Sequence, residues 1–308
     1  MEDQAIIFLK IARMVLERIL GFGDREPSSP TFGCYDRYYW HYKLHDLPNA
    51  RLQEAILYLS RIRPFVLEVA RSSISKWIRG GIEFWSRQRH SDGSVDEIYP
   101  WERSFCATAM SCQAVTAAWL NLDIRPEVDF THTGHWLTVN SNADVTNQMA
   151  AACLALYRIF QITGERRFEQ AAYNKFLAIA RRQMSNGCYR EYDGADIGYA
   201  TITLSLLGQY AQMSELQEVW DSMRRCEFFL RSVVDMDGRY RYEDTSRQTQ
   251  FLYPSGLARL NSPIVERIID GLRNNRIINP LWLDDRYCIP LATDYLDAYL
   301  ALTKSEKS

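Results

Sequence analysis

Carboxyl and hydroxyl side chains that could do acid–base chemistry gather in a few short polar stretches of this chain. Glu97 and Glu102 stand in one stretch, and Asp196 and Tyr199 stand in another. Glycoside hydrolysis needs two carboxyl groups, one as general acid and one as base or nucleophile. Elimination beside a carboxylate needs instead a base such as Tyr or His and groups that stabilise the enolate. We predict Glu97 and Asp196 as the first catalytic pair, Glu102 as a further acid, and Tyr199 or His41 as the base of an elimination.

The same stretches supply side chains that could bind a sugar. A sugar ring stacks on an aromatic face and forms directional hydrogen bonds with polar side chains nearby. Asn147, Gln148 and Arg247 could hold a substrate carboxylate. The predicted binding residues are Trp40, His41, Lys43, Tyr99, Trp101, Asn142, Asn147, Gln148, Glu191, Asp193, Arg247 and Tyr253. The aromatics could instead pack in the core or at its rim, the acids could cap helices, and the Arg could pair with a nearby acid.

A repeated pattern connects these polar stretches. Residues 83–97 and 179–191 share one order: a helical segment, Gln, a short polar gap, Gly, three residues and Glu. Residues 227–243 contain a degraded third copy, with Val in place of Gln and the Glu displaced by one position. Polar, aromatic clusters at 36–46, 140–144 and 283–287 fall in the same series, with a spacing of about 47–51 residues. A period of this length, with two helices in each unit, is typical of helical repeat proteins.

Hydrophobic periodicity supports a chain built from helices with almost no strand signal. It predicts helices over 2–20, 49–61, 64–89, 103–121, 145–163, 166–184, 199–213, 215–234, 263–274 and 290–304. Pro64, Pro263 and Pro290 each stand near the first turn of one of these helices, where a missing N–H costs little. An open superhelix or a closed ring would satisfy the repeat. We expect an all-α fold, an α/α toroid in which about six helical hairpins close around a central funnel.

The domain prediction is a single α/α toroid over residues 1–308. Residues 1–22 form an amphipathic helix that we expect to pack on this domain, with membrane-surface or partner binding as the alternative. The polar loops at one phase of every repeat would then meet around one funnel. Simple helix capping is the other explanation for these loops, since Asp, Asn and Gly are common at helix ends.

Two resemblances support the toroid. Residues 81–88, followed by Asp92, Gly93 and Ser94, resemble the QW-type repeat of squalene and hopene cyclases, although the chain lacks the DxDD motif of those enzymes. Residues 140–148 and 191–199 resemble the helical-toroid domains of polysaccharide lyases of the heparinase and alginate-lyase type. They also resemble uncharacterised proteins of bacterial surface-polysaccharide gene clusters. The second resemblance implies a carbohydrate substrate, and it covers roughly a third of the chain.

Composition excludes several classes of function. The net charge of -2 provides no basic field for nucleic acid. The N-terminus resembles neither a signal peptide nor a membrane span, and the cysteines form no CxxC motif, so we expect a cytoplasmic protein without a bound metal. No Gly-rich phosphate loop and no GxSxG motif is present, and we expect no cofactor.

The leading hypothesis is an enzyme, a glycoside hydrolase or polysaccharide lyase, that binds and cleaves an acidic oligosaccharide or polysaccharide in its funnel. One alternative is a terpene or prenyl cyclase-like enzyme, which would have a funnel lined mainly by aromatic and apolar side chains. Another is a non-catalytic helical-repeat scaffold that binds a partner protein, with its acids exposed to solvent. The convergence of Glu97, Asn142, Gln148, Asp196 and Arg247 on one cavity would favour the carbohydrate hypothesis.

Overall fold

The computed structural model describes residues 2–304, and most of these residues lie in helices. Within that span the strands are β1 (Arg190–Glu191) and β2 (Gly194–Ala195), which form a short antiparallel ribbon. The prediction of an all-α chain is confirmed. No helix in the described part of the chain has both the length and the apolar character needed to cross a lipid bilayer.

One series of helices lines the middle of the molecule. It consists of α4 (Ala55–Ile62), α6 (Phe105–Leu120), α8 (Thr146–Thr163), α10 (Ile197–Ser214), α12 (Ser255–Arg259) and α14 (Asp285–Lys304). Each of these inner helices packs on the next in the series, and α14 packs on α4. Helices α6, α8 and α10 are buried on nearly all sides, which explains why they are rich in Ala and other small residues.

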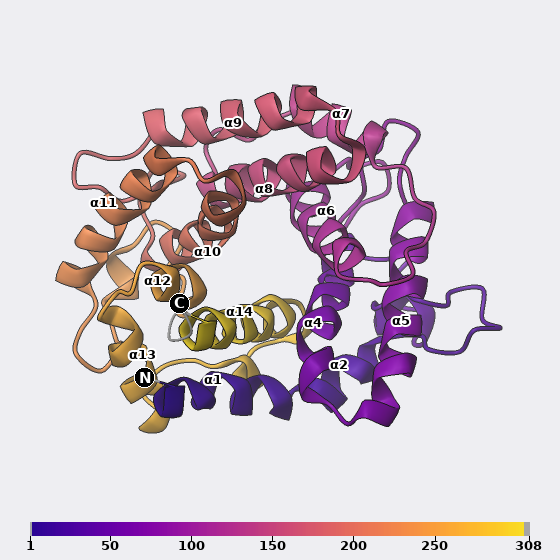
Figure 1. Cartoon of the computed structure of the whole chain (residues 1–308), viewed down its shortest axis with the longest axis horizontal. Coiled ribbons are helices and arrows are strands. Elements are labelled where there is room, and N and C mark those ends of the chain that lie inside the picture. Colours follow the sequence, from indigo (N-terminus) through magenta and orange to yellow (C-terminus); the bar gives the residue numbers. More distant parts are fainter. Residues whose placement is uncertain (1, 305–308) are drawn as a thin grey trace.

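A second series lies outside the first (Figure 1). It consists of α1 (Glu2–Met14), α5 (Glu68–Arg87), α7 (Thr131–Val139), α9 (Arg166–Arg181), α11 (Gln217–Val233) and α13 (Ile264–Arg273). Apart from α7, these outer helices are amphipathic. In α13, for example, Ile264, Ile268 and Leu272 recur every four residues and are buried, whereas Glu266 is exposed. The core therefore lies between the outer and inner helices, and α1 completes it by packing on α14 and α13.

The repeated Gly of the sequence has a structural reason. Gly93 and Gly187 have φ of 90° and 91°, and the N–H of each donates to the carbonyl three residues earlier, at 2.9 Å. A Cβ on Gly93 would lie 2.3 Å from the backbone N of Thr133 in α7, and a Cβ on Gly187 would lie 2.4 Å from the carbonyl O of Arg225 in α11. Each turn thus packs directly on the next outer helix, where only Gly fits.

Several element predictions are wrong. Helix α7 and the short α12 were not expected, and both contain weak helix formers that become helical by packing on neighbouring helices. The predicted helix over 2–20 is broken at Val15, where α2 (Leu16–Phe22) takes over. Helix α14 begins at Asp285 rather than 290, so Pro290 lies inside it.

Short elements connect the two helix layers. They are α3 (Arg37–Trp40), η1 (Ala50–Glu54), η2 (Arg63–Phe65), η3 (Tyr242–Asp244) and η4 (Pro280–Trp282). Pro64 lies in η2, and α5 therefore begins at Glu68, four residues after the predicted start. The loop that precedes α8 lacks a Gly, and there the buried Lys175 of α9 donates to Ser141 Oγ at 2.6 Å. In this loop the contact with the outer helix is therefore made by the Lys175 side chain, whereas at Gly93 and Gly187 it is made by the backbone of the turn.

Candidate functional site

A cavity of about 530 Å³ lies at the N-terminal ends of the inner helices, and we call it the N-terminal cavity. Its wall contains the starts of three inner helices: Ser104, Phe105 and Cys106 at α6, Val145, Asn147 and Gln148 at α8, and Arg286, Tyr287 and Pro290 at α14. Helix N-termini carry partial positive charge and free N–H groups. The N–H groups at the starts of α6 and α8 are in part capped by Ser104 and Glu191, so binding of an anion at this end depends mainly on the basic side chains in the wall.

Half of the predicted site residues line this cavity, although they come from distant segments of the chain. They are Glu97, Glu102, Asn142, Asn147, Gln148, Tyr199, Arg247 and Tyr253. The other predicted residues do not line it: Trp40, His41, Lys43, Tyr99, Trp101, Glu191, Asp193 and Asp196. Of the five residues whose convergence would favour a sugar site, only Asp196 lies outside the cavity wall.

Glu97 is the predicted acid that the structure holds most firmly in the cavity wall. Its side chain is 7% exposed, and its Oε1 pairs with Nη2 of Arg286. Ser104 Oγ, at the N-cap of α6, donates to Glu97 Oε2 at 3.3 Å. Glu97 thus stands in the cavity wall with one carboxyl oxygen paired to Arg286 and the other held by Ser104.

Asp196 was predicted to be catalytic, but its oxygens are fully used by the protein. Its Oδ1 accepts the Tyr199 N–H at 2.9 Å and caps α10. Its Oδ2 accepts from Thr245 Oγ1 at 3.0 Å, the Arg247 N–H at 3.0 Å and the Thr249 N–H at 3.3 Å. Asp196 therefore fixes the loop that carries Arg247 instead of meeting a substrate.

Glu191 was predicted to bind substrate, and it is a buried cap instead. Its carboxylate accepts the N–H groups of Asn147 and Thr146, at 2.8 and 3.2 Å, at the start of α8. Burial raises the pKa of Glu191 to about 8, although the two N–H donors act in the opposite direction. The spacing between Gly187 and Glu191 therefore places this carboxyl at the start of the preceding inner helix, α8. Asp193, in the turn of the ribbon that follows, is exposed.

Tyr199 lies in the cavity wall as predicted, but it is not suited to act as a base. Burial raises its pKa to about 12, and the neighbouring Tyr287 adds to the effect. The phenol therefore keeps its proton at neutral pH. Tyr199 can donate a hydrogen bond or a proton to a substrate oxygen, and the predicted role as proton acceptor is not supported by this environment.

Glu102 stands at the rim of the cavity, where it organises a loop. Its Oε2 accepts the N–H groups of Glu97, Ile98 and Tyr99 at 3.0, 2.8 and 3.4 Å. The loop is thereby held with Tyr99 and Trp101 exposed, at 68% and 73%. Neither aromatic ring contributes to the cavity wall.

The aromatic and basic residues predicted near position 40 lie elsewhere. The indole Nε1 of Trp40 donates to the Phe22 carbonyl at 2.7 Å, so this ring is held against α2. His41 and Lys43 are exposed. The stacking surfaces of the cavity are provided by other aromatic residues, namely Phe105, Tyr192, Tyr199, Tyr253 and Tyr287.

Arg247 is the predicted residue with the clearest capacity to bind an anion. Its guanidinium lies over the Tyr192 ring, 4.5 Å from the ring centroid. No carboxylate within residues 2–304 forms an ion pair with it, whereas the cavity residues Arg51 and Arg286 pair with Glu54 and Glu97. Arg247 thus has donors available for a ligand that enters the cavity.

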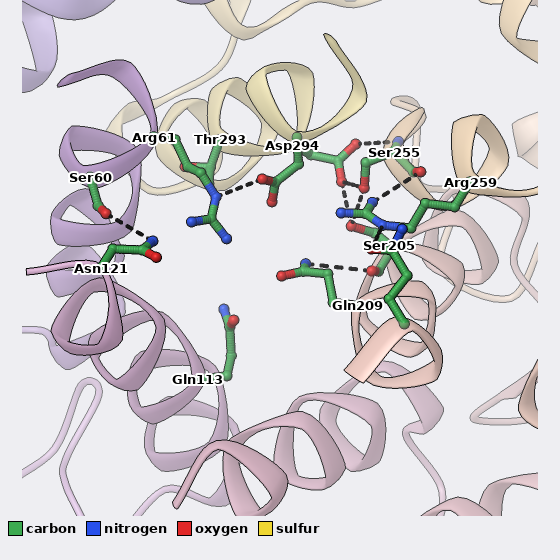
Figure 2. Close-up of polar contacts among 12 residues, drawn as sticks. Ser60, Arg61, Gln113, Asn121, Ser205, Gln209, Ser255, Arg259, Thr293 and Asp294 are labelled. Carbon is green, nitrogen blue, oxygen red and sulfur yellow. Dashed lines mark hydrogen bonds and ion pairs between the residues drawn. The ribbon is translucent and has the colours of Figure 1, made fainter. Parts of the chain in front are cut away.

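The deeper part of the cavity contains polar residues that the sequence analysis missed. Gln113, Ser205, Gln209, Asp294 and Asp297 come from the middle of inner helices. Figure 2 shows Gln113 and Gln209 pointing into the space between these helices, with Asp294 beside Ser255. Asp294 accepts from Ser205 Oγ, Ser255 Oγ and the Ser255 N–H, and burial raises its pKa to about 6. Isolated polar residues in apolar helices were the signal that could have revealed them.

The cavity as a whole combines carboxyl groups, one guanidinium that forms no ion pair within residues 2–304, amide groups and tyrosine rings around one space. Such a set can bind a polar, anionic molecule and can move a proton. Compared with known proteins, the chain matches no protein-family model and no curated protein sequence.

Proposed function

We propose that this protein binds an acidic oligosaccharide or polysaccharide in the N-terminal cavity and cleaves it. The observation that carries the proposal is that Glu97, Asn142, Gln148, Tyr199 and Arg247 line the same cavity. Arg247 would pair with a uronate carboxylate, and the tyrosine rings would stack on sugar rings. Arg286 Nε is buried and has no hydrogen-bond partner within residues 2–304, which supports a ligand that supplies an acceptor.

The fold that we propose for this site is an α/α toroid. Its support is the order of contacts among the inner helices, which runs from α4 to α14 and returns to α4. A toroid would explain why loops about 50 residues apart contribute to one cavity. The free cysteines support a reducing compartment, and we place the activity in the cytoplasm on that basis.

The cleavage step that best suits these residues is a β-elimination. Glu97 would take the proton from the carbon beside the uronate carboxylate, and Arg247 would stabilise the negative charge that develops on that carboxylate. The electron pair would form a carbon–carbon double bond as the bond to the leaving sugar oxygen breaks. Tyr199 would give its proton to that oxygen, and solvent would exchange the protons between Glu97 and Tyr199 before the next turnover. Hydrolysis is the competing outcome, in which water adds across the bond and no double bond forms.

The cyclase alternative fits the cavity less well. A hydrocarbon substrate would need a lining of mainly aromatic and apolar groups. The N-terminal cavity instead contains Arg51, Glu54, Glu97, Arg247 and Arg286. Desolvating these charges against a hydrocarbon would be unfavourable.

The test is to incubate the protein with a panel of uronate-containing and neutral glycans. The ultraviolet absorbance of unsaturated uronates reports elimination, and new reducing ends report cleavage by either route. We expect Glu97→Gln to lower turnover about a hundredfold or more. Glu266→Gln on the exposed face of α13 is the matched control and should keep full activity. If no acidic glycan is bound or cleaved, the remaining interpretation is a non-catalytic scaffold.

A further inference from the structure

A second cavity lies at the other end of the inner helices, and we call it the C-terminal cavity. Its volume is about 520 Å³. Its wall comes from the C-terminal parts of α4, α8, α10, α12 and α14 and from the loop after α12. The lining residues are Arg61, Arg158, Gln209, Gln212, Met213, Ala258, Arg259, Asn261, Asp297, Leu300 and Ala301. Gln209 and Asp297 also line the N-terminal cavity, so these two side chains stand between the two spaces.

The C-terminal cavity has an excess of positive charge. Arg61, Arg158 and Arg259 line it, and Asp297 is the single carboxylate in its wall among the described residues. Arg61 Nε donates to Asp297 Oδ1 at 2.6 Å, which leaves the other two guanidinium groups without a carboxylate partner. Figure 2 shows Arg61 and Arg259 on opposite sides of the space.

Neutral oxygens are the only acceptors that hydrogen-bond to Arg158 within residues 2–304. Its Nη1 donates to the Gln113 carbonyl at 2.6 Å and to Gln113 Oε1 at 3.0 Å, and its Nη2 donates to Gln209 Oε1 at 2.7 Å. The side chain is buried, at 3% exposure. Burial lowers the pKa of Arg158 to about 9, and the charge of Arg61 acts in the same direction, whereas the charge of Asp297 acts in the opposite one.

Arg259, from α12, also donates only to neutral oxygens within residues 2–304. Its Nε donates to Gln212 Oε1 at 2.9 Å and its Nη1 to the Ser255 carbonyl at 3.1 Å. Its Nη2 donates to no acceptor within the described chain, so this nitrogen has hydrogens available for a ligand. The C-terminal ends of the inner helices offset part of this positive charge, but partial charges at helix ends do not supply a counter-ion.

We propose that the C-terminal cavity binds a phosphate-class oxyanion, held by the guanidinium groups of Arg158 and Arg259. Arginine is suited to this ligand because its planar donors match a tetrahedral oxyanion in pairs. A compact, doubly charged anion would also neutralise the two charges that lack carboxylate partners. The ligand would be either free phosphate or the phosphate group of a small ester, and the volume of the cavity accommodates both. This inference does not depend on the saccharide activity of the N-terminal cavity.

The test is isothermal titration calorimetry of the full chain with inorganic phosphate and, separately, with glucose 1-phosphate, at constant ionic strength set with chloride. We expect saturable binding at one site, and the tighter of the two ligands identifies the free ion or the ester. Arg259→Gln should weaken binding about tenfold or more, because a charge-assisted pair of hydrogen bonds is lost. Arg273→Gln, on the exposed end of α13, is the matched control and should bind like the wild type.

A further variant tests which cavity binds the anion. Arg247→Gln alters the N-terminal cavity and should leave phosphate binding unchanged. If Arg247→Gln abolishes binding while Arg259→Gln does not, or if neither ligand gives a saturable heat, the proposal is wrong. Circular dichroism checks the fold of each variant. Should Arg259→Gln fail to fold, Arg259→Lys keeps the charge and the aliphatic stem, and it should still lose affinity because the paired donors are gone.

Discussion

At the scale of single residues, the carboxylate of Asp196 has a positioning role that can be tested. Asp196→Asn would present an NH₂ group where the backbone N–H groups of Arg247 and Thr249 now donate, or would lose the Tyr199 contact. We expect a loss of about 1–3 kcal/mol in the free energy of unfolding, measured by urea denaturation. We also expect weaker binding of an acidic glycan, because the loop that carries Arg247 loosens. Asp193→Asn, in the exposed turn, is the control, and equal stability of the two variants would contradict the assigned role.

The residues that line the cavity were easier to predict than the hydrogen bonds that each of them forms. Spacing along the chain identified Glu97 and Asn142, because residues at one phase of a repeat face the same way. Gln148 and Arg247 were predicted instead from their ability to hold a substrate carboxylate. The spacing did not separate Asp196 from Glu97, since both are acids beside a helix start. The difference lies in donors from residues about 50 positions away, such as Thr245 at Asp196. Local sequence does not reveal those contacts.

At the scale of elements, the turn glycines predict a difference between two substitutions. Gly164 has φ of 75°, and a Cβ added there would have no atom within 4 Å, whereas a Cβ on Gly187 would lie 2.4 Å from the Arg225 carbonyl O. Gly164→Ala should therefore lower the free energy of unfolding by about 1–2 kcal/mol, which is the cost of holding a residue with a Cβ in the left-handed conformation. Gly187→Ala should lower the free energy of unfolding by more, about 3 kcal/mol or above, because α11 must also move away. Urea unfolding of both variants measures the difference, and equal losses would show that the turn does not need its close approach to α11.

The long helices were the most predictable elements, and the structure reproduces α8, α9, α10 and α11 to within a few residues. Helices α9 and α11 have one apolar face, whereas α8 and α10 are long, largely apolar segments that are buried on nearly all sides. Helix α7 was missed because its first residues, Thr131 to Gly134, have low helix propensity. Its stability comes from packing on α6, α8 and α9, which a sequence window does not contain.

At the scale of the whole molecule, α1 joins the first and last inner helices. Phe8 packs edge-on against Tyr295 of α14, with 5.2 Å between ring centroids, and Tyr58 of α4 donates to the Ala12 carbonyl of α1 at 2.7 Å. Arg61 of α4 also pairs with Asp297 of α14. If these contacts close a ring, then loosening α1 weakens both ends of the inner series together.

Phe8→Ala tests this closure. The side chain is fully buried, so its removal should cost about 3–5 kcal/mol in the free energy of unfolding. In a closed ring, hydrogen exchange measured by mass spectrometry should become faster in both α4 and α14, because the ring opens at the junction they share. Phe228→Ala, at an exposed position of α11, should change neither helix. Faster exchange confined to α1 and α14, with α4 unaffected, would indicate an open superhelix, because only then would the first inner helix be independent of the last.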